Sequence, residues 1–290
     1  MRTGICSTDF ETRPADRLFA DIAEKGYECT QFSFSSVTEC GFQPSGQIEI
    51  PAAVSDAAVD AIITASEKYN IPIAAVNGTF NMAHPDKEIR DRGIALFDNF
   101  ASASRKLGSR FITLCSGTRE KSNLWSYSPL NKNPDAWEDM ADTVKRAVDI
   151  AEKYDMTLAI ESEASNIIDT PEAARRIMDE VGSDKLKMIL DCANLFHRGK
   201  AHPENVHDVM EHAFELFGND IVIAHGKDIK EGDSIDFCGT GEGIVDFVYM
   251  AEMLDKWNFK GDMFLHGIYD ESKMKSALKC WKDAEKAALR

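Results

Sequence analysis

The segments KMILDCAN (residues 187–194) and IVIAHGKD (residues 221–228) decide the fold of this chain. Each opens on a short apolar run and closes on polar side chains that can bind a metal. Two further segments, TLAIE (157–161) and DMFLH (262–266), repeat the pattern. Short apolar runs of this kind are typical of buried parallel strands. Four strands that each end in a carboxylate or an imidazole indicate a barrel with a metal site at its mouth.

Strand-like and helical segments alternate along the whole chain. The predicted strands are Thr3–Ser7, Glu28–Phe34, Pro72–Val76, Arg110–Cys115, Thr157–Ile160, Lys187–Leu190, Ile221–Ala224 and Met263–Leu265. The predicted helices are Pro14–Lys25, Ser55–Tyr69, Asp86–Leu107, Asp135–Tyr154, Pro171–Val181, Pro203–Phe217, Ile244–Trp257 and Glu271–Ala288. Eight such units predict a closed (β/α)₈ TIM barrel that forms one domain over residues 1–290. The alternative is an open doubly wound sheet, which usually has fewer strands.

Composition narrows the class of protein. The 290 residues carry a formal charge of -16, which disfavours nucleic acid as a partner. No apolar run approaches the roughly 18 residues that span a bilayer, and the N-terminus lacks the pattern of a secretory signal. The seven cysteines are an odd number without a Cys-x-x-Cys pair. We therefore expect free thiols and a cytoplasmic protein that does not contact membranes.

The predicted metal ligands are Glu161, Asp191, His225 and His266, one from each of strands five to eight. A single acidic residue or histidine after a strand is usually a cap or a structural residue. Four on consecutive strand ends converge at one rim of a barrel. Mixed oxygen and nitrogen ligands suit Mn²⁺, the expected ion, with Zn²⁺, Co²⁺ or Mg²⁺ as alternatives.

Other polar residues near the strand ends have two interpretations each. Asn194 either caps the segment that follows or contacts substrate or a ligand. Lys227 could bind a substrate oxyanion, with Asp228 orienting it or His225; the alternative is a Lys–Asp pair on a loop. Trp125 could stack on a sugar or anchor its own loop.

Three loops also need an interpretation. Those at 35–51 and 117–134 are long enough to cover an active site at the catalytic rim. The glycines of residues 239–243 could cradle a phosphate or simply form a flexible turn.

The chain resembles the sugar phosphate isomerase/epimerase group of xylose isomerase-like barrels, relatives of endonuclease IV, over nearly its full length. The motifs that carry the resemblance are LAIE (158–161), LDCANL (190–195), AHGKD (224–228), GTGEG (239–243), GTFNMAHPD (78–86) and TLCSGTR (113–119). The resemblance implies that Glu161, Asp191 and His225 bind a divalent metal. It also implies a small-molecule sugar or polyol substrate. The expected substrate-binding residues are Asn81, His84, Arg119, Trp125, Asn194 and Asp228.

One position departs from the family pattern. A glutamate is usual at the end of strand eight, where it serves as fourth ligand and, in keto-sugar 3-epimerases, as one of two acid–base carboxylates. Here the residue is His266. Its presence puts a symmetric two-carboxylate epimerisation in doubt.

The resulting hypothesis is a metal-dependent isomerase or epimerase of a sugar, sugar phosphate or polyol. Glu161 removes a proton beside the carbonyl, giving an enediolate that the metal stabilises. His266 returns the proton or acts as fourth ligand, and Lys227 is the third catalytic candidate. A lyase or dehydratase acting on a keto-sugar or an inosose-like polyol uses the same site.

Two alternatives come from other classes of protein. A non-catalytic sugar-binding or partner subunit is consistent with the substitution at His266. A DNA-repair endonuclease is disfavoured by the negative charge and the small number of histidines. Because acidic barrels often pair through their outer helices, a homo-oligomer remains open.

Overall fold

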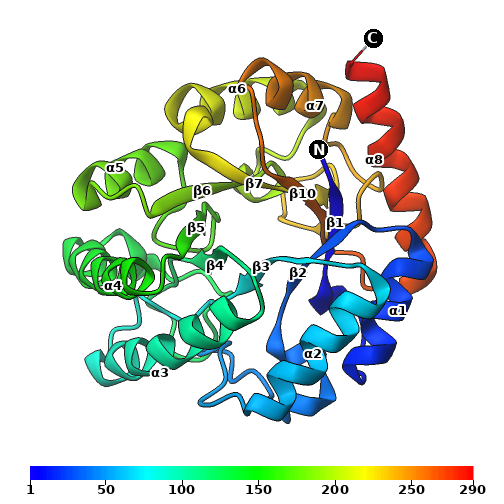
Figure 1. The fold of residues 1–290 in the computed structure, drawn as a ribbon. Coiled ribbons are helices and arrows are strands. Elements are labelled where there is room, and N and C mark those ends of the chain that lie inside the picture. Colours follow the sequence, from blue (N-terminus) through cyan, green and yellow to red (C-terminus); the bar gives the residue numbers. More distant parts are fainter. Residues whose placement is uncertain (290) are drawn as a thin grey trace.

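Eight parallel strands close into a barrel that helices surround (Figure 1), in a computed structural model that describes residues 1–289. The strands follow chain order around the ring, and β10 pairs with β1 to close it. They are β1 Thr3–Cys6, β2 Cys29–Phe32, β3 Ile73–Asn77, β4 Phe111–Cys115, β5 Thr157–Glu161, β6 Leu186–Asp191, β7 Ile221–Gly226 and β10 Asp262–Leu265. The predicted (β/α)₈ TIM barrel is confirmed, and the open doubly wound sheet was the wrong alternative.

A helix follows each barrel strand. The helices are α1 Ala15–Lys25, α2 Asp56–Tyr69, α3 Lys87–Lys106, α4 Pro134–Lys153, α5 Pro171–Val181, α6 Val206–Phe217, α7 Phe247–Lys256 and α8 Met274–Ala288. The predicted start of α7 at Ile244 was three residues early, because Asp246 caps the helix by accepting the N–H of Tyr249. The residues predicted to open α6 and α8 form 3₁₀ turns instead.

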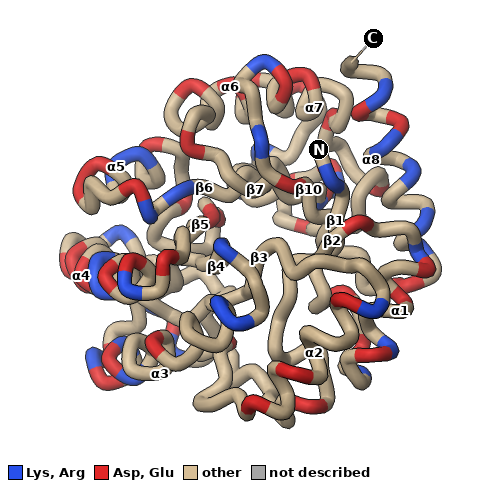
Figure 2. Tube along the Cα trace, in the orientation of Figure 1, with Lys and Arg blue, Asp and Glu red and all other residues tan. Residues whose placement is uncertain are grey.

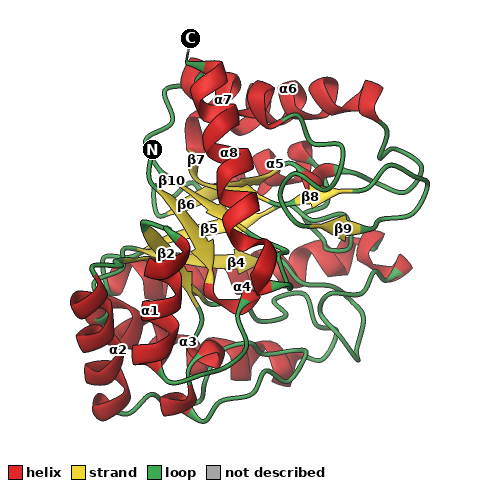
Figure 3. Ribbon diagram, turned by 90° about the vertical axis from the view of Figure 1, so that its right-hand side faces the viewer, coloured by secondary structure: helices red, strands yellow, loops and turns green. Residues whose placement is uncertain are grey.

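The second predicted strand was too long. It ends at Phe32 because the side chain of Ser33 accepts the N–H of Ser35 and starts a 3₁₀ turn. Two short strands were not predicted at all. β8 (Asp228–Ile229) and β9 (Phe237–Cys238) form an antiparallel pair, which lies beyond the barrel strands in Figure 3. Strands of two residues are too short to produce a periodic pattern.

The interior of the barrel is built in layers, because alternate strand residues point inward. One apolar layer consists of Cys6, Cys29, Ala75, Ala159, Ile189, Ile223 and Phe264. Gly4 makes room for the largest of these, since a Cβ there would lie 2.7 Å from the Phe264 ring. The residues two positions further along the strands form the next layer, at the carboxyl rim. Glu161, Asp191, His225 and His266 all belong to that rim layer.

Charged residues of both signs lie along the outer helices (Figure 2). Several join neighbouring helices, as Lys153 does with Asp98 at 2.6 Å and Lys68 with Asp16 at 2.6 Å. Because water screens such exposed pairs, each contributes little to the stability of the fold. Among residues 1–289, none of the helices combines the length and the apolar character that crossing a membrane requires.

Candidate metal centre and adjoining cavity

Three adjacent strands bring two carboxylates and an imidazole together at the barrel rim. Glu161 ends β5, Asp191 ends β6 and His225 lies near the end of β7, directly opposite Asp191 in the strand register. One ligand atom from each lies within 4.8 Å of the others, and all three residues are buried. The structure therefore brings together three of the four predicted metal ligands.

Asn194 orders the two carboxylates. Its Nδ2 donates to Glu161 Oε1 at 2.8 Å. Asp191 Oδ1 accepts the backbone N–H groups of Ala193 and Asn194 at 3.0 and 3.2 Å. The other oxygen, Asp191 Oδ2, is buried without a hydrogen-bond partner among the described residues. A buried carboxylate oxygen that accepts no hydrogen bond is costly unless positive charge lies close to it.

His225 presents one ring nitrogen to the carboxylates. Its Nδ1 lies 3.2 Å from Glu161 Oε1 and 3.7 Å from Asp191 Oδ2, while Nε2 lies 2.9 Å from Oε1 of Gln31 on β2. If Nε2 carries the hydrogen and donates it to Gln31, the lone pair of Nδ1 is free to bind a metal. Metal-binding histidines usually have such a partner on their other ring nitrogen. Sequence reasoning missed Gln31, which no local motif marks as a partner of a residue almost 200 positions away.

The electrostatics of the cluster fit a cation. Burial alone would raise the pKa of Asp191, but the Lys227 ammonium and His225 lower it below its ordinary value. Burial alone would lower the pKa of His225, but the Glu161 and Asp191 carboxylates raise it to about 9. Two carboxylates and an imidazole are a donor set for a divalent transition metal. These three residues therefore fit a divalent metal ion.

His266 occupies a different position from the three clustered residues. Its ring centre is 5.7 Å from that of His225, and its Nδ1 lies 3.2 Å from Asp9 Oδ1. The ring lines the cavity above the cluster.

Lys227 lies beside the cluster. Its Nζ donates to Asn194 Oδ1 at 2.5 Å and is 3.4 Å from Asp191 Oδ2. The ammonium group also lies 4.1 Å from the centre of the Phe237 ring, on the short strand β9. Lys227 is therefore a buried positive charge next to the candidate metal position, not a residue of an exposed pair.

A cavity of about 480 Å³ opens above the cluster. Its lining includes Trp125, Glu163, Asn194, Lys227, His266 and Tyr269. Trp125, 43% exposed, comes from the long loop after β4. Glu163 is buried and accepts the Ser165 hydroxyl at 2.6 Å; burial raises its pKa.

Two predicted substrate-binding residues brace rim loops and do not line this cavity. The Asn81 side chain donates to Gln47 Oε1 at 2.7 Å and accepts the N–H of Thr118 at 2.9 Å. These two hydrogen bonds join the loops that follow β2, β3 and β4. His84 Nδ1 accepts the N–H of Asp86 at 3.0 Å.

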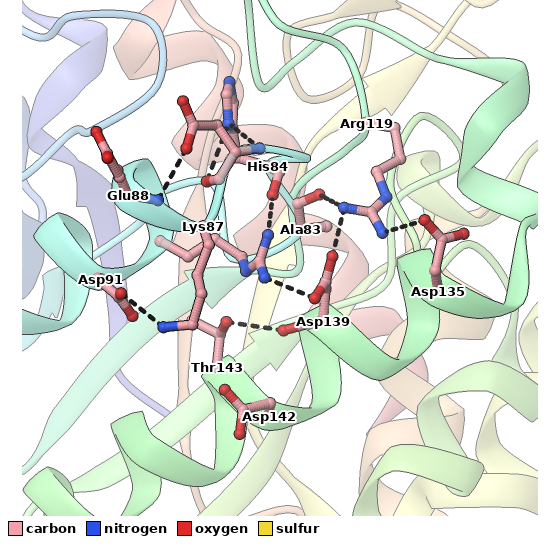
Figure 4. A network of polar contacts seen from close by, with 12 residues as sticks. Ala83, His84, Lys87, Glu88, Asp91, Arg119, Asp135, Asp139, Asp142 and Thr143 are labelled. Carbon is pink, nitrogen blue, oxygen red and sulfur yellow. Dashed lines mark hydrogen bonds and ion pairs between the residues drawn. The ribbon is translucent and has the colours of Figure 1, made fainter.

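Arg119, also a predicted substrate-binding residue, lies in an ion-pair network (Figure 4). Its guanidinium donates to the carbonyl of Ala83 at 3.2 Å and pairs with Asp135 at 3.0 Å and Asp139 at 2.7 Å. Asp139 also pairs with Arg90 at 2.6 Å. This network ties the loops after β3 and β4 to helix α4.

Asp228, the remaining predicted substrate-binding residue, anchors the glycine-rich loop. Its carboxylate accepts the N–H groups of Gly241 at 3.1 Å and of Gly243, Val245 and Ile229 at 2.9 Å. A phosphate cradle would need such N–H groups free. This loop is therefore a turn held by Asp228, as the simpler of the two interpretations had it.

Comparison with known proteins places this geometry in context. None of the curated proteins matches the chain. Solved structures match at low identity and therefore show the fold alone. A D-tagatose 3-epimerase-like protein has 17% identity, full coverage of both chains and a TM-score of 0.73. D-psicose 3-epimerase from Clostridium cellulolyticum H10 with D-tagatose has 16% identity, coverage of 98% and 99%, and a TM-score of 0.70. The IOLI protein with a bound zinc atom has 17% identity, coverage of 99% and 98%, and a TM-score of 0.72.

A family model gives the assignment. The model described as xylose isomerase-like TIM barrel matches residues 19–284, which is most of the chain. It agrees with the resemblance that the motifs at the strand ends predict. The chain belongs to the xylose isomerase-like TIM barrel family.

Proposed function

We propose that this protein is a metal-dependent isomerase or epimerase of a keto-sugar or related polyol. The observation that carries the proposal is the cluster of Glu161, Asp191 and His225, whose ligand atoms lie within 4.8 Å of one another at the catalytic rim of the barrel. The shared fold with sugar 3-epimerases supports it.

The three clustered residues would hold the ion, with Mn²⁺ expected and Zn²⁺, Co²⁺ or Mg²⁺ as alternatives. When bound, such an ion supplies Lewis-acid polarisation of the substrate oxygens. The similar IOLI structure contains a bound zinc atom, which supports a metal ion in a protein of this fold.

The protein's own side chains then move the proton. Glu161 takes the proton from the carbon next to the carbonyl, and the electron pair moves onto the carbonyl oxygen. Asn194 holds Glu161 in place through its 2.8 Å hydrogen bond. The ammonium group of Lys227, held beside Asp191, stabilises the negative charge that develops on the substrate oxygens.

The cavity wall supports a hydroxyl-rich substrate. The polar residues Gln31, Ser33 and Asn77 are part of its lining. Side chains of these types can form hydrogen bonds with sugar hydroxyls. The exposed ring of Trp125 offers an apolar surface on which a sugar face can stack.

A lyase or dehydratase is the second candidate. Loss of a β-hydroxyl needs a group that protonates the leaving oxygen. His266 lines the cavity and is an imidazole at the position where the family resemblance leads us to expect a glutamate.

The decisive experiment is proton exchange. The protein loaded with Mn²⁺ or Zn²⁺ is incubated in D₂O with a panel of keto-sugars and inososes, and deuterium at the carbon beside the carbonyl is followed by NMR. Wild type should exchange with at least one of them, and Glu161→Gln and Asp191→Asn should not. Glu172→Gln, on the outer helix α5, is the control that should behave like wild type. An absence of exchange and of elimination product with every compound would instead favour the non-catalytic sugar-binding subunit.

A further inference from the structure

A buried carboxylate holds His266 in place. Asp9 ends the 3₁₀ turn that follows β1, and its side chain is fully buried. Asp9 Oδ1 lies 3.2 Å from Nδ1 of His266, and Asp9 Oδ2 accepts the N–H of Ile268 at 2.8 Å. Because β1 and β10 are paired neighbours in the ring, both contacts form where these two strands end. The bond to Ile268 anchors the chain after β10, and the bond to His266 orients its ring.

Asp9 decides which nitrogen of His266 faces the cavity. An ionised carboxylate can only accept a hydrogen bond, so Nδ1 of His266 carries the hydrogen. Among residues 1–289, Nε2 has no hydrogen-bond partner, and His266 lines the cavity with 26% of its side chain exposed. Nε2 is therefore the nitrogen that can exchange a proton with a bound molecule. A carboxylate that fixes the tautomer of an imidazole in this way is a recurring arrangement in acid–base catalysis.

His266 faces the cavity from a different side than Glu161. In the ring of strands, β5 and β10 are separated by β6 and β7, so their ends lie on different walls of the mouth. Both side chains line the same cavity. His266 does not belong to the cluster of ligand atoms that Glu161, Asp191 and His225 form. It is therefore free to act on the substrate.

We propose that His266 is the acid–base group opposite Glu161 and that Asp9 is its positioning residue, in place of a second carboxylate. This inference rests on the proposed function. Glu161 takes the proton next to the carbonyl, and the enediolate oxygen receives the electron pair. Protonated His266 then donates its Nε2 proton to the same carbon from the other face, or to the neighbouring carbon. Glu161 ends with one proton more and His266 with one fewer, and exchange with water restores both.

Three variants test the inference. Asp9→Asn keeps an amide oxygen for the Ile268 N–H but presents an NH₂ group to His266, which favours the wrong tautomer. His266→Gln removes the imidazole at a partly exposed position, where folding is least at risk. Glu172→Gln is the matched control, because it replaces the carboxylate of another histidine–carboxylate contact, the 2.6 Å contact to His212, on the outer helices.

We expect Asp9→Asn and His266→Gln to lose net substrate interconversion by roughly 10²- to 10⁴-fold. Both should keep wild-type metal content and should still exchange the proton of one substrate isomer in D₂O, because Glu161 is intact. Nitrogen-15 NMR of the wild-type imidazole should report the Nδ1–H tautomer, and Asp9→Asn should shift it to Nε2–H. The control should match wild type in every measurement.

Other outcomes would overturn the inference, each in a recognisable way. Loss of metal from His266→Gln would make His266 a ligand. An Nε2–H tautomer in wild type, or wild-type interconversion by both variants, would remove the roles of Asp9 and His266 while leaving the proposed function intact. A wild-type protein that neither exchanges nor interconverts any compound of the panel would remove the proposed function and this inference together.

Discussion

Lys227 Nζ lies 3.4 Å from Asp191 Oδ2, the buried carboxylate oxygen that lacks a hydrogen-bond partner among the described residues. The ammonium charge keeps this carboxylate ionised, but at such a distance it also repels a divalent ion. We therefore expect Lys227 to weaken the proposed metal binding and to stabilise the negative charge that the proposed reaction places on the substrate oxygens.

Lys227→Met should accordingly bind Mn²⁺ more tightly than wild type, by roughly tenfold or more. Its turnover should fall by about 10²-fold, because the charge that stabilises the substrate oxyanion is gone. Titration calorimetry and the D₂O exchange assay measure the two effects. Lys132→Met, which removes a lysine that is 61% exposed, is the control. Weaker metal binding by Lys227→Met would show that the lysine supports the ion instead.

Substitutions can distinguish the proposed metal ligands from a neighbouring carboxylate that does not bind the ion. Asp191→Asn and Glu161→Gln should each retain less than about a tenth of the wild-type metal after dialysis, because each removes a charged ligand. Glu163→Gln changes a buried carboxylate two residues from Glu161 that is outside the cluster, and it should retain the ion. Elemental analysis of the purified proteins decides this, and equal metal content in all of them would contradict the assigned site.

A free keto-sugar should be a better substrate than its phosphate ester. Lys227 is the one lysine or arginine that lines the cavity within residues 1–289, and it is already bonded to Asn194. Glu49, Glu161 and Glu163 line the same cavity and would repel a phosphate. We expect kcat/KM for the free sugar to exceed that for the ester by at least about tenfold. The reverse order would reveal a phosphate site that this cavity does not display.

Arg119 should matter for stability and not for substrate affinity. Arg119→Met breaks the pairs with Asp135 and Asp139 and leaves the Ala83 carbonyl without its donor. The free energy of unfolding should fall by about 2–3 kcal/mol, since the partner carboxylates keep some contact with water. Urea denaturation measures this loss, and KM should stay within about twofold of wild type. A large rise in KM with unchanged stability would instead show that Arg119 binds the substrate.

His84 should make stability depend on pH. Burial lowers the pKa of His84, and its Nδ1 accepts the N–H of Asp86, which requires the neutral ring. The unfolded chain therefore takes up this proton before the folded chain does as the pH falls. The contribution of His84 is complete above about pH 6.5 and is lost below it.

The test compares wild type with His84→Gln by urea denaturation at about pH 7.5 and about pH 5.5. The free energy of unfolding of wild type should fall more on acidification than that of the variant. An equal fall in both proteins would mean that His84 keeps an ordinary pKa in the folded state.

Local sequence determined the barrel and the strand ends of this protein. Apolar strand runs and helical periods are set by residues a few positions apart, so the eight units and the rim positions of Glu161, Asp191 and His225 follow from the sequence alone. The glycine-rich loop at residues 239–243 and Lys227 were also visible in the sequence, although their partners were not.

Only the tertiary structure decided which atoms meet. Gln31 lies 194 positions from His225, and Asp9 lies 257 positions from His266. Closure of the barrel sets both contacts, because it pairs β1 with β10 and brings the ends of β2 and β7 to the same mouth. For the same reason Arg119, which follows a rim strand, was predicted to face the substrate, yet it turns toward the carboxylates of helix α4. The order of the strands determines the backbone position of a residue, whereas the packing of distant segments determines the direction of its side chain.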